Sequence, residues 1–133
     1  MAEIKYRPAR AEDHEAIRQF LSGVGWHRRV SDPAKFKRMM EGADRTVVAL
    51  DGGRVVGFAR ALCDGVSNGY LSMLAVSPEM RGRGIGREIV RRLTDDESGE
   101  ITWVLRAGRE SRGFWERMGF EDSEIAMEKT RRR

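Results

Sequence analysis

The sequence has little cysteine, little proline and no long apolar run. Its single cysteine, Cys63, excludes an internal disulfide and favours a reducing, cytoplasmic location. Only 3 prolines occur and the apolar residues fall in periodic blocks, so the chain is not predicted to be disordered. No apolar stretch approaches the roughly 20 residues that a bilayer-spanning helix needs, and we expect no membrane partner. No His, Cys or Asp cluster has the spacing of metal ligands, so no metal is expected.

The positive charge of this chain is concentrated in one place. The 133 residues predict one domain, 1–133, with 25 basic and 21 acidic side chains and a net charge of +4. Between residues 81 and 92, five arginines face one acid, and three more arginines end the chain at 131–133. Such a cluster attracts a polyanion, either nucleic acid, a phosphorylated cofactor or an acidic surface. A solvated helix face is the alternative explanation.

The spacing of apolar residues predicts alternating strands and helices. Strands are expected at 4–8, 46–50, 55–63, 70–76 and 101–106, with a final hairpin that contains Phe120, Ile125 and Met127. Helices are expected at about 12–22, 33–42, 84–97 and 110–118. Trp26 to Arg29 are expected in a loop. The order of these elements predicts a mixed α/β domain around one sheet.

A glycine-rich loop separates the strand expected at 70–76 from the helix that follows it. Gly82, Gly84 and Gly86 alternate with Arg83 and Ile85 at the start of that helix. The first N–H groups of a helix have no intrahelical partner and favour an anion, and glycine lets it come close. The loop lacks the Lys-Ser/Thr of a Walker loop, and its third glycine is wrongly spaced for a dinucleotide fingerprint. It therefore predicts a pyrophosphate site of another kind.

Two segments together resemble a known family. Arg81 to Gly86 has the pattern R-x-x-G-x-G, preceded by Val76-x-Pro78, and this resembles the acetyl-CoA loop of the GNAT superfamily of N-acetyltransferases. Residues 111–120, S-R-G-F-W-E-R-M-G-F, look like the A-x-x-F-Y-E-K-x-G-F segment of the same family. The separation of the two segments and the order of elements agree over nearly the whole chain.

The resemblance implies a fold and a cosubstrate. The fold is a central, mostly antiparallel mixed sheet of six to seven strands with about four helices, in which strands four (70–76) and five (101–106) splay apart. Acetyl-CoA would bind in this splay, with its pantetheine arm on the main chain of strand four and its pyrophosphate on the amides of the loop. The backbone amide of Leu74 would stabilise the oxyanion. The cofactor-binding residues implied are Leu74, Ala75, Val76, Arg81, Gly82, Arg83, Gly84, Ile85, Gly86, Arg87, Ser111, Phe114 and Trp115.

The proton-handling residues of the family are missing. A carboxylate is usual in strand four, where this chain has Ser72 and Met73. The usual tyrosine that protonates the leaving thiolate is Trp115 here, and an indole is no acid at neutral pH. Three explanations stay open: another acid or base, water as the proton carrier, or binding with little catalysis. Candidates for another acid or base are Tyr70, His27, Asp64 and Glu110.

The function expected from this resemblance is transfer of the acetyl group of acetyl-CoA to a primary amine. We expect a small-molecule acceptor and direct attack in a ternary complex. An acyl-CoA-binding sensor module with little or no catalysis is the alternative, and a nucleic-acid partner is not expected because the loop arginines would face cofactor phosphates. A homodimer is compatible with the family. The residues do not identify the acceptor amine, the general acid and base, or the oligomeric state.

Overall fold

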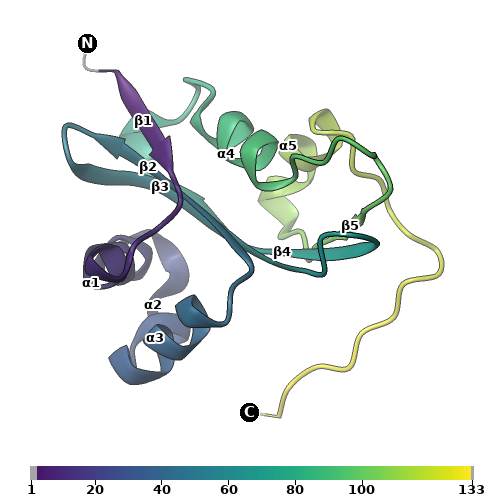
Figure 1. Cartoon of the computed structure of the whole chain (residues 1–133), viewed down its shortest axis with the longest axis horizontal. Helices are drawn as coiled ribbons and strands as arrows, with labels where there is room; N and C mark the ends of the chain where they lie inside the picture. Colours follow the sequence, from purple (N-terminus) through teal and green to yellow (C-terminus); the bar gives the residue numbers. More distant parts are fainter. Residues whose placement is uncertain (1–2, 133) are drawn as a thin grey trace.

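One sheet forms the centre of the molecule (Figure 1). The computed structural model describes residues 3–132, so Met1, Ala2 and Arg133, the last residue of the arginine tail, lie outside the described residues. The strands lie side by side in chain order, each antiparallel to the next except that β4 and β5 are parallel. Their bounds are Ile4–Arg7 for β1, Arg45–Asp51 for β2, Arg54–Cys63 for β3, Asn68–Val76 for β4 and Thr102–Val104 for β5.

Helices cover both faces of the sheet and divide the core into two clusters. On one face lie α1 (His14–Leu21), the π-helical η2 (Ser22–Trp26), α2 (His27–Val30) and α3 (Pro33–Glu41). On the other face lie α4 (Ile85–Leu93) and α5 (Arg112–Arg117). Short 3-10 turns connect these elements: η1 (Ala11–Asp13), η3 (Pro78–Met80) and η4 (Arg109–Ser111). Among residues 3–132, no helix combines the length and the apolar character needed to cross a bilayer.

Helix α3 shows how local sequence determines an element. The Asp32 carboxylate accepts hydrogen bonds from the N–H groups of Ala34 and Lys35, at 3.0 and 3.2 Å, and Pro33 occupies the first helical position. Phe36 and Met40, four residues apart, are buried on one face. The helix predicted at 33–42 is confirmed at Pro33–Glu41. Its cap, its first residue and its buried face each favour a helix at this place.

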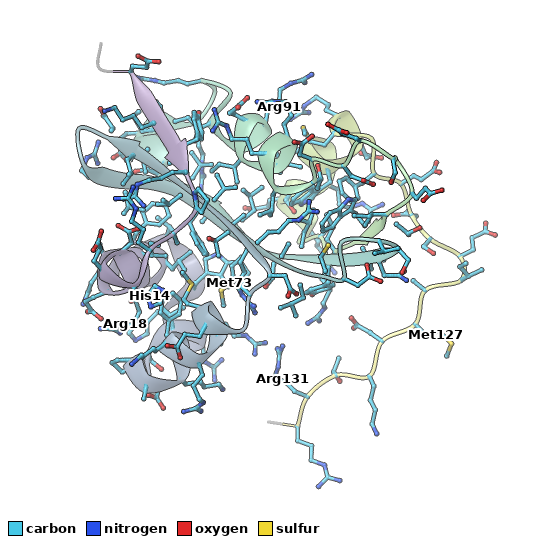
Figure 2. All side chains as sticks on the ribbon, viewed as in Figure 1. His14, Arg18, Met73, Arg91, Met127 and Arg131 are labelled. Atoms are coloured by element: carbon cyan, nitrogen blue, oxygen red, sulfur yellow. The ribbon has the colours of Figure 1, made fainter. Side chains whose placement is uncertain are left out.

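The expected C-terminal hairpin is wrong for the described residues. The segment after α5 forms no strand up to residue 132, and the sheet has five strands rather than six to seven. Ile125 and Met127 are 92% and 97% exposed, and Figure 2 shows Met127 on a segment that leads away from the domain. Alternating apolar residues stabilise a strand only where one face meets a core, and these meet solvent.

Other expected elements differ mainly in length. Helix α4 ends at Leu93 rather than near residue 97, and β5 has three residues rather than six. The loop expected at 26–29 is wrong, because Trp26 ends η2 and the next three residues lie in α2. Gly25, with φ of +109°, separates α1 from α2 within η2. The mixed α/β class and the mostly antiparallel sheet are confirmed.

Asp13 joins β1 to the start of α1. The Arg7 guanidinium donates two hydrogen bonds to its carboxylate, at 2.6 and 3.0 Å, and the Arg10 N–H donates a third at 2.7 Å. The Asp13 side chain is only 14% exposed. Hydrogen bonding by Arg7 is the main cause that lowers the pKa of the Asp13 carboxyl below its usual value.

This interaction predicts a component of acid lability. Because the folded state depresses the pKa of Asp13, the stabilisation is fully present above the unfolded pKa near 4 and is lost as pH falls through the folded pKa. We expect Asp13→Asn to lower the free energy of unfolding by about 1.5–3 kcal/mol at pH 7. Urea unfolding from pH 7 down to pH 2 measures this. A variant as acid-labile as the wild type would show that another carboxylate causes the effect.

Candidate functional site

Strand β4 contains a bulge at its centre. Ala75 pairs with Phe58 and Ser72 pairs with Arg60, so the two residues Met73 and Leu74 lie opposite one residue of β3. Met73 has φ of +63° and is the one non-glycine residue of positive φ among residues 3–132. A residue with this side chain rarely adopts such a backbone conformation, and bulges of this kind occur next to active sites.

The bulge changes which face each side chain of β4 takes. Before it, Leu71 packs with the cluster under α4. After it, Met73 and Ala75 pack with the cluster under α1 to α3, and Leu74 packs on the α4 side. Figure 2 shows Met73 on the side of α1 to α3. The ladder is therefore interrupted at Met73 and Leu74, where an unbulged strand would have kept its alternation.

Strands β4 and β5 separate next to this bulge. Their pairing joins Asn68 to Thr102, Gly69 to Trp103 and Tyr70 to Val104, after which β5 ends and β4 continues to Val76. Gly69 lets the two strands approach, because the Trp103 ring occupies the position that a Cβ would take. The expected splay of strands four and five is confirmed. The main chain of residues 71–76 is thus not paired with β5 along its edge.

The glycine loop follows the end of β4 directly. After η3, residues 81–84 are exposed and lead into α4, which begins at Ile85 without a side-chain cap. Gly82 and Gly84 have φ of +80° and +81°, and a Cβ at either would have no atom within 4 Å. The loop therefore leaves open space before the uncapped N–H groups of a helix, which suits a phosphate.

The arginines near this loop are not equivalent. Arg91 and Arg92 both bind the Glu88 carboxylate, with nitrogen–oxygen distances of 2.6 Å, and they lower the pKa of Glu88 to about 2. Arg81 and Arg87 are exposed and form no ion pair with a described residue. Part of the positive charge counted in the sequence is therefore neutralised within α4, and part remains for an anion.

Gly86 has a role in packing as well as its place near the glycine loop. A Cβ there would lie 3.2 Å from the edge of the Phe114 ring, so this glycine allows α4 and α5 to pack closely. Phe114 in turn lies edge-on to Trp115, with ring centroids 5.0 Å apart, and Trp115 is edge-on to Phe120 at 5.3 Å. Trp115 is 8% exposed and belongs to the core under α4. Ser111 ends η4, just before α5, and is half-buried.

The candidate acid and base residues are spread over the molecule. Tyr70 is half-buried on β4 in the row before the splay. His27 is exposed at the start of α2, with its Nδ1 atom 2.7 Å from the Ser22 hydroxyl. Glu110 is exposed in η4. Of these three, Tyr70 alone lies on β4 beside the splay.

Asp64 serves a turn. Its carboxylate accepts hydrogen bonds from the N–H groups of Val66, Ser67 and Asn68 and from the Ser67 hydroxyl. These hydrogen bonds lower the pKa of the Asp64 carboxyl strongly, and the bond from the Ser67 hydroxyl is the main cause. The Asp64 carboxylate is therefore a poor base. The structure thus gives Asp64 a structural role in the turn before β4, a role that is typical of an Asp-Gly pair.

One residue near this site was missed by the sequence analysis. Arg60 lies in the middle of β3, opposite Ser72, and its Nε atom is shielded from solvent without a hydrogen-bond partner. An arginine between Ala59 and Ala61 in an otherwise apolar strand is a signal that could have found it. The bulge at Met73 has no comparable signal, because its neighbours form a regular strand pattern.

A cavity of about 870 Å³ lies away from the loop. Its walls come from β5, the end of α4, α5 and the C-terminal segment, and neither Leu74 nor any residue of 81–87 lines it. The bulge, the splay and the loop therefore make up the candidate site, and this cavity is separate from it. Within residues 3–132, no three His, Cys, Asp or Glu side chains are grouped to hold a metal ion.

Comparison with known proteins identifies the family. The family model described as "Acetyltransferase (GNAT) domain" matches residues 42–122, which include β3, β4, the glycine loop and α4. Serotonin N-acetyltransferase 2, chloroplastic, from Oryza sativa subsp. japonica is 33% identical over 116 residues, covering 81% of this chain. That alignment covers 56% of the rice protein, so this chain spans about half the length of its relative. The chain belongs to the GNAT acetyltransferase family.

Solved structures share the whole fold. A GNAT-family protein from Xanthomonas campestris pv. campestris has a TM-score of 0.81 and 23% identity, with 98% of this chain and 94% of that chain covered. Glucosamine-6-phosphate N-acetyltransferase from Arabidopsis thaliana has a TM-score of 0.72 and 18% identity, covering 96% and 98%. At these identities, the likeness establishes the fold.

Proposed function

We propose that this chain transfers the acetyl group of acetyl-CoA to a primary amine of a small molecule. The observation that carries the proposal is the continuous path from the β4 bulge, along the unpaired edge of β4, to the open glycine loop at the start of α4. An extended pantetheine arm fits an unpaired strand edge, and a pyrophosphate fits the free N–H groups of a helix start.

Each part of this path has a role in the proposal. Main-chain groups of Leu74, Ala75 and Val76 would bond the pantetheine arm, and the amides of residues 81–87 would bond the pyrophosphate. The cosubstrate supplies a thioester carbonyl and a leaving thiolate. The amide of Leu74, displaced from the ladder by the bulge, would donate to the oxygen on which negative charge develops. Holding the amine beside that carbonyl contributes at most about 7–11 kcal/mol of barrier lowering.

Proton transfer in the proposal does not involve Trp115. Its ring is buried in the core, and an indole N–H is not an acid at neutral pH. Asp64 is held in its turn, and His27 and Glu110 are exposed on α2 and η4 rather than on β4. Tyr70 or water is therefore left to carry the protons. Tyr70 lies in the last paired row before the splay, so its hydroxyl is the protein group we assign to this role first.

The rice relative suggests one class of acceptor. Its name gives serotonin as its acceptor, which is an amine on an aromatic body. Arylalkylamines are therefore the first acceptors to test on this chain. Calorimetric titration with acetyl-CoA, followed by release of free CoA with a panel of amines, tests the proposed function. Binding without release for any amine would favour the second candidate, an acyl-CoA-binding module, which the buried Trp115 and the absence of a carboxylate at Ser72 and Met73 support.

Arg81 gives a prediction for the loop. We expect Arg81→Ala to weaken acetyl-CoA affinity by about tenfold, or roughly 1.4 kcal/mol, and to reduce the dependence of that affinity on salt. The side chain is exposed and without an ion pair among described residues, so its loss leaves the fold unchanged. Calorimetry at low and high salt measures both effects. Wild-type affinity at low salt would exclude a phosphate role for Arg81.

A further inference from the structure

Arg60 has a charge without a partner. It lies on the central strand β3, half-buried, with Thr46 of β2 on one side and Ser72 of β4 on the other. Its Nε atom is shielded from solvent and has no hydrogen-bond partner, and the side chain forms no ion pair with a described residue. Burial lowers the pKa of its guanidinium, and the one opposing influence is Tyr70. Arginine nevertheless stays protonated in proteins.

The face on which Arg60 lies is defined by its neighbours. Ala59 and Ala61 pack with the cluster under α4, so the side chain between them points to the opposite face, that of α1 to α3. Tyr70 and Ser72 take the same face, because Leu71 between them belongs to the α4 cluster. Arg60 lies opposite Ser72, one row from the bulge, and Tyr70 is near enough to influence the pKa of its guanidinium.

An exposed apolar row lies beside this charge. Leu62, Tyr70 and Val104 are direct neighbours across β3, β4 and β5. Leu62 is 40% exposed and Val104 is 44% exposed, and Tyr70 is half-buried. This is the last paired row before β4 and β5 separate, so an amine that enters the splay from this face passes over it.

An uncompensated charge of this kind is costly in a folded protein. A shielded N–H without a partner costs free energy, and a buried charge is normally paired. A methionine would fill the position without that cost. The planar guanidinium is, in contrast, well shaped to bind a carboxylate or phosphate through two parallel hydrogen bonds.

We propose that Arg60 binds an anionic group, a carboxylate or a phosphate, on the acceptor amine, while the row of Leu62, Tyr70 and Val104 contacts the apolar body of that molecule. The inference rests on the proposed transfer of an acetyl group to a primary amine, and it narrows that acceptor to amines that carry an acidic group rather than the plain arylalkylamines that the rice relative suggests. It therefore predicts that amines with an acidic group are better acceptors than plain arylalkylamines.

Matched acceptor pairs test this inference. The pairs serotonin and 5-hydroxytryptophan, tyramine and tyrosine, and ethanolamine and phosphoethanolamine each differ by one acidic group. We expect the wild type to have a kcat/KM at least about tenfold higher for the acidic member of its best pair. In Arg60→Met, we expect the kcat/KM for that acidic member to fall about 10–100-fold, mainly through KM, with the other member changed by less than about threefold.

Two further variants separate binding from structure. Arg60→Lys keeps the positive charge but loses the planar guanidinium that donates two parallel hydrogen bonds. We therefore expect it to retain part of the preference that Arg60→Met loses. Arg54→Met is the matched control: Arg54 lies on the same strand, six residues away, and binds Glu79 at 3.0 Å. It should keep the wild-type preference. Arg60→Met removes a half-buried guanidinium whose shielded Nε atom has no hydrogen-bond partner, so the melting temperature of the variant should equal or exceed that of the wild type.

Binding is measured in parallel with turnover. The acidic members should raise the melting temperature of the wild-type CoA complex more than that of the Arg60→Met complex. Equal shifts, a preference for the non-acidic amines, or a preference that Arg60→Met retains would each overturn the inference. If acetyl-CoA does not bind the wild type at all, the proposed function fails instead, and calorimetry with acetyl-CoA alone distinguishes that result.

Discussion

Trp115→Ala is expected to lose about 3–5 kcal/mol of the free energy of unfolding, the typical cost of an aromatic ring removed from a core. Trp115 is 8% exposed and packs edge-on against Phe114 and Phe120, so its removal leaves a cavity that α5 and the sheet cannot easily close. Urea unfolding at 25 °C measures the loss. Ile125→Ala is the control, because Ile125 is 92% exposed and its truncation should change stability by less than about 0.5 kcal/mol.

The kinetics of Trp115→Phe test what the indole does in the reaction. A well-placed general acid contributes about 10²–10⁴ in rate, and a buried indole supplies none of this. We therefore expect kcat within about tenfold of the wild type, with effects mainly on the KM for acetyl-CoA or on stability. A loss of kcat beyond about a hundredfold in a stable, saturated Phe variant would show that the indole takes part in the chemical step.

Gly84→Val is expected to abolish measurable acetyl-CoA binding, with an affinity loss of about a hundredfold or more, equal to roughly 2.8 kcal/mol. Gly84 precedes the first helical residue of α4 with φ of +81°, and the space a Cβ would enter is open. The branched side chain would fill the position we assign to the pyrophosphate, and its strained backbone would alter the amides behind it. Calorimetric titration of the folded variant measures the loss.

Two glycines serve as controls for this experiment. Gly53, in the β2–β3 turn, has φ of +88° and equally open space around its Cβ position, so Gly53→Val has the same backbone strain at a distance from the loop. It should bind acetyl-CoA as the wild type does. Gly86→Ala should lose stability rather than affinity, because its Cβ would meet Phe114. Unchanged affinity in Gly84→Val would mean that the cosubstrate lies elsewhere.

The elements that the sequence predicted well are those with local causes. Asp32 caps α3 and Pro33 begins it, while the glycines of the β2–β3 turn adopt the positive φ that such a turn requires. The glycine loop was also locatable, because three closely spaced glycines at the start of a helix have a local physical meaning. The resemblance of two segments then gave the family, which the comparisons confirm.

Elements that depend on distant partners were predicted less well. The alternation of Ile125 and Met127 indicated a strand, but nothing in that pattern says whether a sheet edge or a core lies against it. The five arginines of residues 81–92 looked equivalent until the helix placed Glu88 beside Arg91 and Arg92. The sequence placed Gly86 in the phosphate site, and the structure shows that this glycine also makes room for the Phe114 ring.

The sequence by itself determined the fold class, the family and the position of the glycine loop, because each depends on residues close together in the chain. The tertiary structure decided the rest. The bulge at Met73 follows from the register between β3 and β4, and the splay follows from where β5 stops. The placement of Arg60 beside Tyr70 depends on the pairing of two strands, and its lack of a partner depends on every element around it. Pairing and burial of this kind are set by long-range packing, which local sequence patterns do not encode.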